Sequence, residues 1–425
     1  GWYPHVRGHR TMYHMLQPDE PMLLRALRRH GYFVWWGGKN DVVPAQNGFD
    51  DYCDHKNPAT GPFNNPLFKD ESWRGEPDGD DYYSFFYGRL ESTDGEPVRD
   101  PDWVHVNDAV DFIEDRPADT PLCIYLPLKY PHPPYAVEEP FYSMIDRSKV
   151  PSPIPQPEDW SGKASIMEAI VENRGMGDWT EERWRELRAV SYAMSTRIDH
   201  QLGLVLDALR RENILDDTAV FFFSDHAEYQ GDYGLIELNQ NTFEDSLFRV
   251  PLVIKPPADR GIEPRVSDAM AELIDLPATV EELAGIEPDH THFGRSLLPV
   301  IAGETEQHRD AVFAEGGRLH GERHCMELEP EIHCDPDRIY WPRLSVQTRE
   351  GPEHTKAAMC RTRTHKYVRR HYEQDELYDL ERDPDELDNR IEDPEMSSVA
   401  EDLKERMLSW YMETCDAVPH EPDER

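Results

Sequence analysis

The chain has 425 residues, enough to bury a large core in one big domain with a smaller one beside it. Its 85 acidic residues against 45 Lys and Arg give a formal net charge of −40, which argues against binding nucleic acid or an anionic membrane surface. No apolar run reaches the ~20 residues of a transmembrane helix, and six cysteines without C-x-x-C spacing give no disulfide framework.

The acidic balance also bears on where the protein works. Arg dominates the basic residues, because only ten of the 45 are lysines. Acid excess with scarce Lys is typical of proteins that work in strong salt, where screening weakens self-repulsion. A halophilic protein is therefore one hypothesis, and an ordinary acidic protein is the alternative. With no signal peptide or membrane span visible in the sequence, we expect a cytoplasmic location.

The first part of the chain predicts a helix, a strand and a long irregular insertion. Asp19 is placed to cap a helix that ends at Gly31, since Asp precedes a Pro and a helical apolar pattern. Residues 32–36 then predict a strand that runs into two glycines and Lys39. Residues 44–102 are rich in Asp, Gly, Pro and Asn, and a long insertion of this kind is where specificity usually resides.

A second strand and a proline-rich turn follow. Residues 104–114 predict a helix and residues 122–126 a buried strand, after which come Lys129, Tyr130, Pro131 and His132. His132 lies among prolines on a stiff backbone, which suits a side chain that must point at a substrate. The alternative is a loop histidine that packs on a neighbouring tyrosine. Thr180 is placed to cap a long helix with acidic residues in its first turn.

The stretch from 219 to 257 carries the strongest signal. Residues 219–223 fit a fully buried parallel strand, and Asp225 and His226 follow it, where ligands bind in open α/β sheets. A carboxylate and an imidazole side by side can form half of a divalent-metal site. For an isolated Asp-His pair, the alternative is a turn-capping Asp beside a surface His. Residues 250–254 predict a second strand.

The C-terminal residues have a different character. Short alternating segments at 311–314, 344–348, 359–362 and 367–370 predict strands, and residues 399–414 predict a final helix. We therefore expect two domains, a large α/β domain over 1–304 and a small α+β subdomain over 305–425.

The stretch from 219 to 257 contains three motifs in a fixed order. Ser-Asp-His-x-Glu, Gly-Asp-x-Gly and Phe-Glu-Asp-x-x-x-Arg-Val-Pro, between Ser224 and Pro251, closely resemble the second metal-binding segment of the type I sulfatases. These enzymes belong to the alkaline-phosphatase-like superfamily. The resemblance implies an α/β fold with a mostly parallel sheet flanked by helices and a small C-terminal subdomain of antiparallel sheet plus helix.

The same resemblance implies roles for single residues. Asp225 and His226 correspond to family metal ligands, with Ca²⁺ the expected ion and Mg²⁺ or Mn²⁺ as alternatives. Lys39 corresponds to a lysine that contacts the nucleophile and the sulfate. His132 corresponds to a histidine that binds sulfate and assists the leaving oxygen. Gln240 stands where sulfatases commonly carry a sulfate-binding lysine, so it is the expected substrate-binding amide.

The family nucleophile, a formylglycine, has no counterpart at the expected position. Gly1 resembles the glycine that follows the nucleophile motif, which implies that the nucleophile and the first metal-binding aspartates lie upstream of Gly1. The sequence from Cys334 to Arg338 does match Cys-x-Pro-x-Arg, but we expect it to lie far from the metal. On this basis residues 1–425 alone are expected to lack useful sulfatase activity.

Three functions remain open at this point. The first is hydrolysis of a sulfate ester, by a sulfatase or a fragment of one, on a small or glycan substrate. The second is a phosphodiesterase or phosphonate monoester hydrolase of the same superfamily. The third is a non-catalytic relative that binds sulfated ligands, which Gln240 favours because a neutral amide cannot replace the charge-assisted contact of a lysine.

Overall fold

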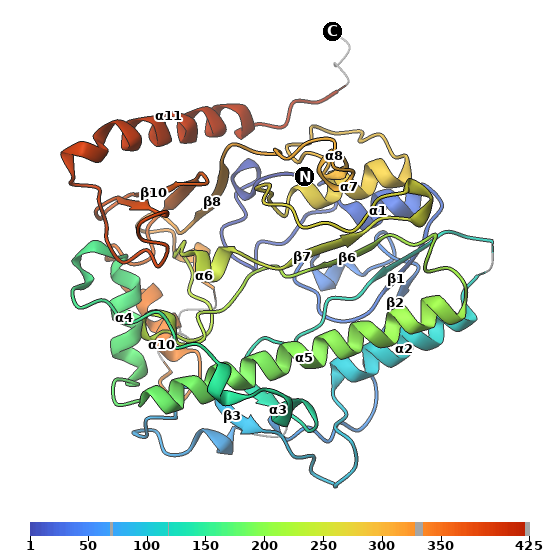
Figure 1. Ribbon diagram of the computed structural model, residues 1–425, viewed down its shortest axis with the longest axis horizontal. Coiled ribbons are helices and arrows are strands. Elements are labelled where there is room, and N and C mark those ends of the chain that lie inside the picture. The colour runs from blue at the N-terminus through green and yellow to red at the C-terminus, as the bar shows by residue number, and fades with distance from the viewer. Residues whose placement is uncertain (69–70, 118, 328–334, 421–425) are drawn as a thin grey trace.

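The computed structural model describes residues 1–68, 71–117, 119–327 and 335–420, and Figure 1 traces the chain through them. The strands in these residues are β1 (Phe33–Trp36), β2 (His55–Lys56), β3 (Phe86–Arg89), β4 (Leu122–Tyr125), β5 (Tyr135–Val137), β6 (Val220–Phe223), β7 (Leu252–Lys255), β8 (Val312–Gly316), β9 (Ala357–Arg361), β10 (His365–Arg370) and β11 (Glu376–Asp379). The helices are α1 (Leu23–Arg29), α2 (Pro101–Asp115), α3 (Phe141–Met144), α4 (Ser165–Arg174), α5 (Glu181–Arg211), α6 (Asp245–Phe248), α7 (Asp275–Ala284), α8 (Leu298–Ile301), α10 (Trp341–Leu344) and α11 (Ser397–Thr414).

The large domain contains a parallel sheet of order β2-β1-β4. The central strand β1 buries Val34, Trp35 and Trp36 almost completely, as expected for a strand covered on both faces. Its register with β4 pairs Phe33 with Leu122, and both predicted strands are present. The prediction that the second strand is buried is wrong, because all four residues of β4 are partly exposed. The loops after β1 and β4 leave the same edge of this sheet, because parallel strands point the same way. They carry Lys39 and His132 respectively.

The predicted parallel pairing of the strand at 219–223 is wrong. In the described residues β6 pairs with β7 in an antiparallel ladder that joins Val220 to Lys255 and Phe223 to Leu252. The prediction that it is fully buried is also wrong, because Phe223 is 42% exposed. A short apolar run fixes neither the direction of its partner nor the cover on its faces, since both are tertiary properties.

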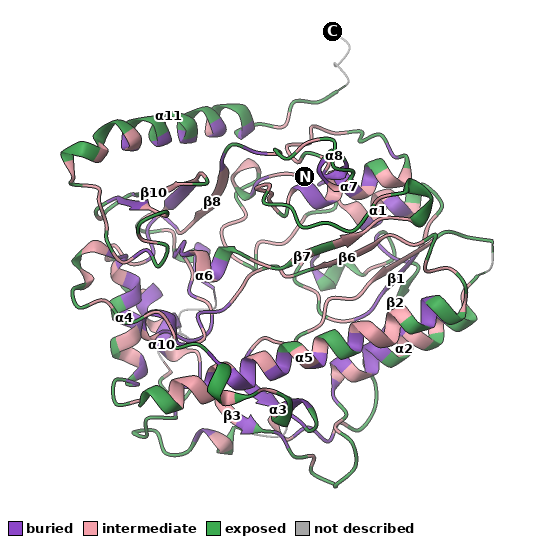
Figure 2. Ribbon diagram, in the orientation of Figure 1, coloured by how far each residue is buried: buried purple, intermediate pink, exposed green. Residues whose placement is uncertain are grey.

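The helices α2 and α5 pack against each other and lie below the sheet region in the view of Figure 1. Thr180 caps α5 as predicted, and its side chain accepts a hydrogen bond from the Arg183 amide at 3.3 Å. Figure 2 shows buried and exposed residues recurring along α2 and α5, the pattern of helices that are covered on one side. No helix in the described ranges is both long enough and apolar enough to cross a membrane.

The predicted cap at Asp19 is wrong, because α1 begins later. Met22 occupies the N-cap position of α1, and the Asp19 carboxylate instead accepts a hydrogen bond from Arg7 at 2.7 Å. A salt bridge to a residue distant in sequence has therefore displaced the local capping interaction. The end of the helix agrees with the prediction, since Gly31 follows it with a φ of +89° that favours glycine.

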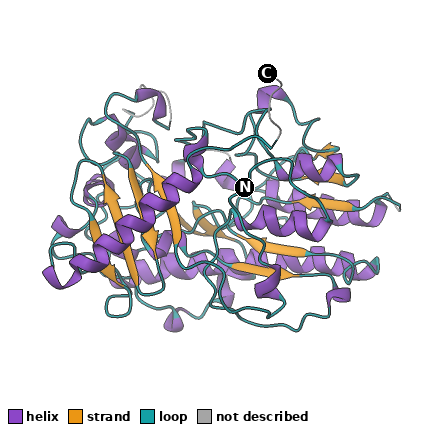
Figure 3. Cartoon of the chain, turned by 90° about the horizontal axis from the view of Figure 1, so that it is seen from above, coloured by secondary structure: helices purple, strands orange, loops and turns teal. Residues whose placement is uncertain are grey.

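The C-terminal part of the chain forms an antiparallel sheet of order β11-β10-β9-β8. The helix α11 packs against this sheet through Leu403, Met407 and Trp410, and Figure 3 shows the arrangement from above. The predicted strand at 344–348 is wrong: these residues continue from α10 as a 3₁₀ turn. Pro342 favours a helical start at that point, which an alternating apolar pattern does not reveal.

Ion pairs join the C-terminal sheet to α6, which lies within the motif stretch. Asp245 on α6 accepts hydrogen bonds from Arg361 at 2.9 and 2.7 Å and from Lys366 at 2.7 Å. Lys163 and Glu244 form a further buried pair at 2.8 Å. The chain that carries Asp225 and His226 is thereby fastened to the C-terminal sheet.

Candidate active site

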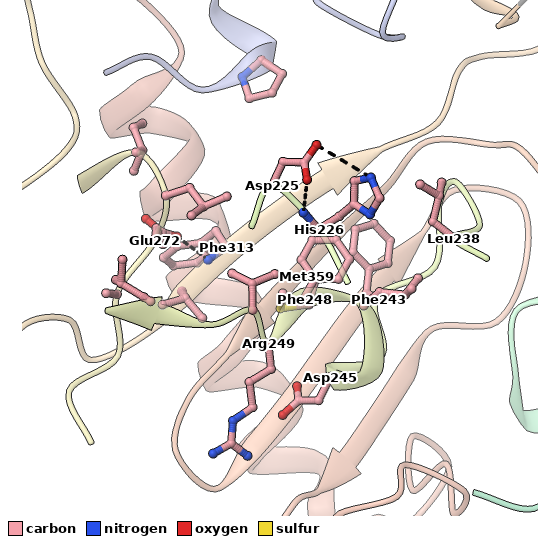
Figure 4. A pocket seen from close by; sticks show the side chains of 18 of the residues that line it. Asp225, His226, Leu238, Phe243, Asp245, Phe248, Arg249, Glu272, Phe313 and Met359 are labelled. Atoms are coloured by element: carbon pink, nitrogen blue, oxygen red, sulfur yellow. Dashed lines mark hydrogen bonds and ion pairs between the residues drawn. The ribbon is translucent and has the colours of Figure 1, made fainter. Parts of the chain in front are cut away.

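One large cavity gathers the residues that the motifs single out. Its volume is about 2200 Å³, and both the α/β domain and the C-terminal sheet contribute to its lining. Lys39, Lys129, His132, Asp225 and His226 all line it. The structure therefore brings the four expected catalytic and metal-binding side chains to a single cavity, and Figure 4 shows part of it from close by.

Asp225 and His226 present their donor atoms together at the end of β6. Asp225 Oδ2 lies 3.7 Å from His226 Nε2, and Figure 4 shows the two side chains on the same side of the backbone. The His226 ring nitrogen Nδ1 lies 3.0 Å from the Ala227 carbonyl. A carbonyl only accepts, so Nδ1 carries the proton, and neutral His226 presents the Nε2 lone pair. Metal-binding histidines have this arrangement.

Asp225 and His226 alone offer too few donor atoms to hold a metal ion. The Asp225 side chain is 74% exposed, so its carboxylate is open to a ligand. In the described part of the chain, no group of three or more His, Cys, Asp or Glu residues is positioned to hold a metal ion. A cation that takes ~6–8 oxygen ligands needs more donors than these two. Asp225 and His226 therefore fit as part of a coordination sphere.

Lys39 reaches the cavity from the loop after β1. Gly38 has a φ of +90°, and a Cβ built there would lie 2.0 Å from the Pro127 carbonyl oxygen, so only glycine fits. This close approach lets the Lys39 amide donate to the same carbonyl at 2.9 Å. The Lys39 ammonium lies 2.6 Å from Asp41 Oδ2. The carboxylate of Asp41 therefore partly neutralises the charge of the lysine.

His132 is held in a defined tautomer. Its Nδ1 lies 2.7 Å from the Pro133 carbonyl, so Nδ1 is the protonated nitrogen and Nε2 the acceptor in the neutral ring. Burial, together with the nearby charges of Lys39 and Lys129, lowers the pKa of His132 to about 4, although the contact with the Pro133 carbonyl acts in the opposite direction. His132 is therefore neutral near pH 7 in the free protein. Its ring lies 6.5 Å from that of His226, centroid to centroid.

The loop that carries His132 is fastened at its start. The carboxylate of Asp102, near the beginning of α2, accepts hydrogen bonds from the Lys129 amide at 3.0 Å and from the Tyr130 amide at 2.8 Å. The Arg197 guanidinium lies 3.9 Å from the centre of the Tyr130 ring. Arg197 is itself held by Asp100 at 2.7 Å. These contacts fix the positions of Lys129 and His132 on the wall of the cavity.

Gln240 is committed to neighbours in the C-terminal part of the chain. Its Nε2 donates to Glu327, a carboxylate that also pairs with Arg343 at 2.6 Å. Gln347 Nε2 lies within 3.4 Å of the same carboxylate. One of the two Nε2 hydrogens of the amide expected to bind substrate is therefore already used, and only the other can be donated to a ligand while this contact holds.

Several cavity residues were missed by the sequence reasoning. Arg343 and Glu327 come from the segment after β8, where no motif marked them. Asn239 and Asn241 flank Gln240 and also line the cavity. The run Asn-Gln-Asn, at the place where the family commonly has a lysine, was the available signal.

Arg249 and Arg338 are two further residues that belong to sequence motifs. Figure 4 shows the Arg249 side chain of Arg-Val-Pro pointing away from Asp225 and His226. Of the Cys-x-Pro-x-Arg match, Cys334 lies outside the described residues, while Arg338 lines the cavity. The arginine of that match thus lies on the same large cavity as the expected metal ligands.

The comparison with protein families agrees with this geometry. The family model described as Sulfatase matches residues 3–286, more than half of the chain. The chain belongs to the sulfatase family. That family lies within the alkaline-phosphatase-like superfamily, and the α/β fold with its parallel sheet agrees with this membership.

Individual relatives are more distant. A multifunctional alkaline phosphatase superfamily protein, PehA of Trinickia caryophylli, is 26% identical over 313 residues, which cover 70% of this chain and 56% of that protein. A choline-sulfatase of Rhizobium meliloti (strain 1021) is 28% identical over 323 residues, which cover 73% and 55%. The chain spans little more than half the length of these curated relatives.

The solved structures show the same fold. The phosphonate monoester hydrolase of Agrobacterium radiobacter superposes with a TM-score of 0.71 at 22% identity, over 99% of this chain and 88% of that one. At this identity the likeness establishes the fold alone.

Proposed function

We propose that this sulfatase-family chain belongs to an enzyme that hydrolyses sulfate esters with the help of a divalent metal. The observation that carries the proposal is the convergence of Lys39, Lys129, His132 and the Asp225–His226 pair on one cavity. In a protein of net charge −40, cationic side chains facing a common space suit an anionic substrate.

The residues of this chain have separable roles in the reaction. Hydrolysis breaks the bond between sulfur and the ester oxygen, and water supplies a hydroxyl to sulfur and a proton to the alcohol. Lys39 and Lys129 would offset the negative charge that the sulfate oxygens carry. His132 would contribute Nε2, which accepts a proton in the neutral ring. A bound anion also raises the pKa of His132, because a nearby opposite charge favours the imidazolium form, which can donate to the leaving oxygen.

Asp225 and His226 would hold the metal, through a carboxylate oxygen and Nε2. Oxygen donors with one imidazole suit Ca²⁺ first, with Mg²⁺ and Mn²⁺ as alternatives. A bound cation would add positive charge next to the sulfate. The family's nucleophile, a formylglycine, is assigned to no described residue.

Hydrolysis of a phosphonate monoester or phosphodiester is the second candidate. It is favoured by the similarity to PehA, a multifunctional member of the superfamily, and the site as built offers nothing that rejects phosphorus. The deciding assay compares turnover of 4-nitrophenyl sulfate and bis(4-nitrophenyl) phosphate by the natural full-length protein with added Ca²⁺ or Mn²⁺. A higher kcat/KM for the sulfate supports the first candidate, and the reverse supports the second. Binding of sulfate without turnover of either ester would identify a non-catalytic relative.

The assay also tests the nucleophile. Cys334→Ala is expected to leave kcat/KM unchanged, because we propose that the nucleophile is a residue other than Cys334. Loss of turnover in a Cys334→Ala variant of unchanged melting temperature would instead identify the match at 334–338 as the nucleophile motif.

We further infer that the chain divides near residue 304 and that the protein works in strong salt. The separate four-stranded antiparallel sheet, whose first strand in the sequence is β8, supports a large domain over 1–304 and a subdomain over 305–425. The net charge of −40 supports adaptation to salt, because screening relieves acidic self-repulsion. The melting temperature should rise steeply between low and molar NaCl, whereas a flat response would contradict the salt adaptation.

A further inference from the structure

The peptide group between Gly38 and Lys39 is bound at both of its ends. Its N–H donates to the Pro127 carbonyl at 2.9 Å, and its C=O accepts a hydrogen bond from the Nζ of Lys56 at 2.8 Å. In a trans peptide the N–H and the C=O point in opposite directions, so these two contacts together fix the plane of the peptide. The backbone at the expected sulfate-binding lysine is therefore held from β2 on one side and from the loop after β4 on the other.

The turn that carries Lys39 needs such a restraint, because two glycines precede the lysine. Gly38 has a φ of +90°, and a glycine backbone reaches more conformations than that of any other residue. A rotation of the Gly38–Lys39 peptide would break both contacts and would change the direction in which the Lys39 side chain leaves the backbone. Trp36 adds to the restraint, since its Nε1 donates to the Lys39 carbonyl at 3.2 Å.

The surroundings of Lys56 leave its ammonium group free to serve the Gly38 carbonyl. The Lys56 Nζ lies 5.2 Å from the centre of the Trp36 ring and 5.6 Å from that of Phe49, and it forms no ion pair with Asp or Glu among the described residues. Buried Lys366, by contrast, pairs with two carboxylates. Aromatic faces stabilise a cation without accepting its hydrogens as strongly as a carboxylate does. They also add no negative charge behind a site for an anion.

We propose that Lys56 is a positioning residue, which orients Lys39 toward a bound sulfate group by holding the Gly38 carbonyl. This inference rests on the proposed sulfate ester function, in which Lys39 offsets the charge of the sulfate oxygens. Lys39 lines the cavity, whereas Lys56 is not among the lining residues. Lys56 therefore acts through Lys39 and not by contact with the substrate.

Amide hydrogen exchange tests the positioning without any ligand. Lys56→Met keeps the aliphatic stem but removes the donor, so the Lys39 amide should exchange about tenfold faster, because one hydrogen bond contributes on the order of tenfold to a local opening equilibrium. The Gly37 amide, which donates to the Tyr125 carbonyl at 3.0 Å, is the internal reference and should not change. Lys56→Arg retains a cationic donor and should restore slow exchange. Lys149→Met, at a side chain that is 82% exposed, is the matched control.

Calorimetric titration of the natural full-length protein with inorganic sulfate tests the consequence for the site. Lys56→Met should lower the sulfate affinity about fivefold, which is less than the effect on exchange because Lys39 is 40% exposed and still reaches the ligand part of the time. The same substitution in a Lys39→Met background should leave the affinity unchanged, since the positioning then has nothing to act through. A merely structural role of Lys56 would not show this dependence on Lys39.

The outcomes separate this proposal from the sulfatase proposal. Unchanged exchange of the Lys39 amide in Lys56→Met would overturn the positioning role. A sulfate affinity that Lys56→Met leaves unchanged, or lowers equally in both backgrounds, would also overturn it, and an equal loss would show that Lys56 acts through its charge alone. If the exchange accelerates but inorganic sulfate does not bind the wild type, the positioning of Lys39 stands and the sulfate function fails. Should Lys56→Met lower the melting temperature, Lys56→Gln, with its shorter side chain, repeats both measurements, and unchanged exchange there is equally decisive.

Discussion

Lys39 and Asp225, the charged residues of the expected sulfate and metal site, differ sharply from the charged residues that join α6 to the C-terminal sheet. At the cavity, the Asp225 side chain is 74% exposed and Lys39 is 40% exposed, with one close carboxylate as its partner. At the junction, Lys366 is 1% exposed and pairs with both Asp245 and Glu386. Charges that are to meet a ligand stay near water, whereas charges that hold the chain together are buried and matched. Each prediction below tests one side of this contrast.

The largest effect is expected from breaking the buried junction. Lys366→Met leaves Asp245 and Glu386 without their shared cation, and an uncompensated buried charge costs about 3–5 kcal/mol in the free energy of unfolding. Urea denaturation measures the loss. Lys149→Met removes a lysine that is 82% exposed and should change the free energy of unfolding by less than about 0.5 kcal/mol. Equal effects of the two substitutions would contradict the contrast.

Acid should weaken the same junction. Burial raises the pKa of Asp245, but hydrogen bonds from Arg361 and the charge of Lys366 outweigh it and lower the pKa to about 2. Because the folded pKa lies below the ordinary value near 3.8, the stabilisation is full above about pH 4 and is lost as pH falls toward 2. The loss amounts to ~2 kcal/mol. Urea unfolding between pH 5 and 2 should show a shallower pH dependence for Asp245→Asn than for the wild type, and identical slopes would refute the assignment.

Substitutions of Asp225 and His226 should do the opposite: they should lower the affinity for metal and change the free energy of unfolding only slightly. Asp225→Ala and His226→Ala each remove one ligand and should reduce Ca²⁺ or Mn²⁺ affinity at least about tenfold, or ~1.4 kcal/mol. The free energy of unfolding should stay within about 0.5 kcal/mol in the absence of metal. Calorimetry provides the affinities, with Asp289→Ala, at a side chain that is 90% exposed, as control. Metal binding that survives in both variants would remove them from the site.

The smallest effect is expected at the exposed cation of the cavity. Asp41→Asn removes the carboxylate 2.6 Å from the Lys39 ammonium and should raise affinity for inorganic sulfate about threefold. The gain is modest because both side chains are over a third exposed and water already screens the pair. Titration at low and at high NaCl should show the gain shrinking with salt, and Lys39→Met should abolish it. A gain that persists in the Asp41→Asn, Lys39→Met double variant would assign it to another cation.

The sequence determined the local features of this protein. The strands at β1 and β4, the helix cap at Thr180, and the side chains that follow the strands could all be predicted, because they depend on residue type and short-range spacing. For the same reason Lys39, His132, Asp225 and His226 were named before their positions were known, and the structure places all four on one cavity.

Only the tertiary structure decided how these pieces meet. The direction of the β6 pairing and the salt bridge of Asp19 to Arg7 both depend on contacts with residues outside the local pattern. The distinction between Gln240, which donates to Glu327, and Asn239, whose side-chain amide has no partner within the described ranges, is of the same kind. Three neighbouring amides look alike in a sequence, because hydrogen-bond satisfaction is a property of the surrounding packed atoms and not of the residue itself.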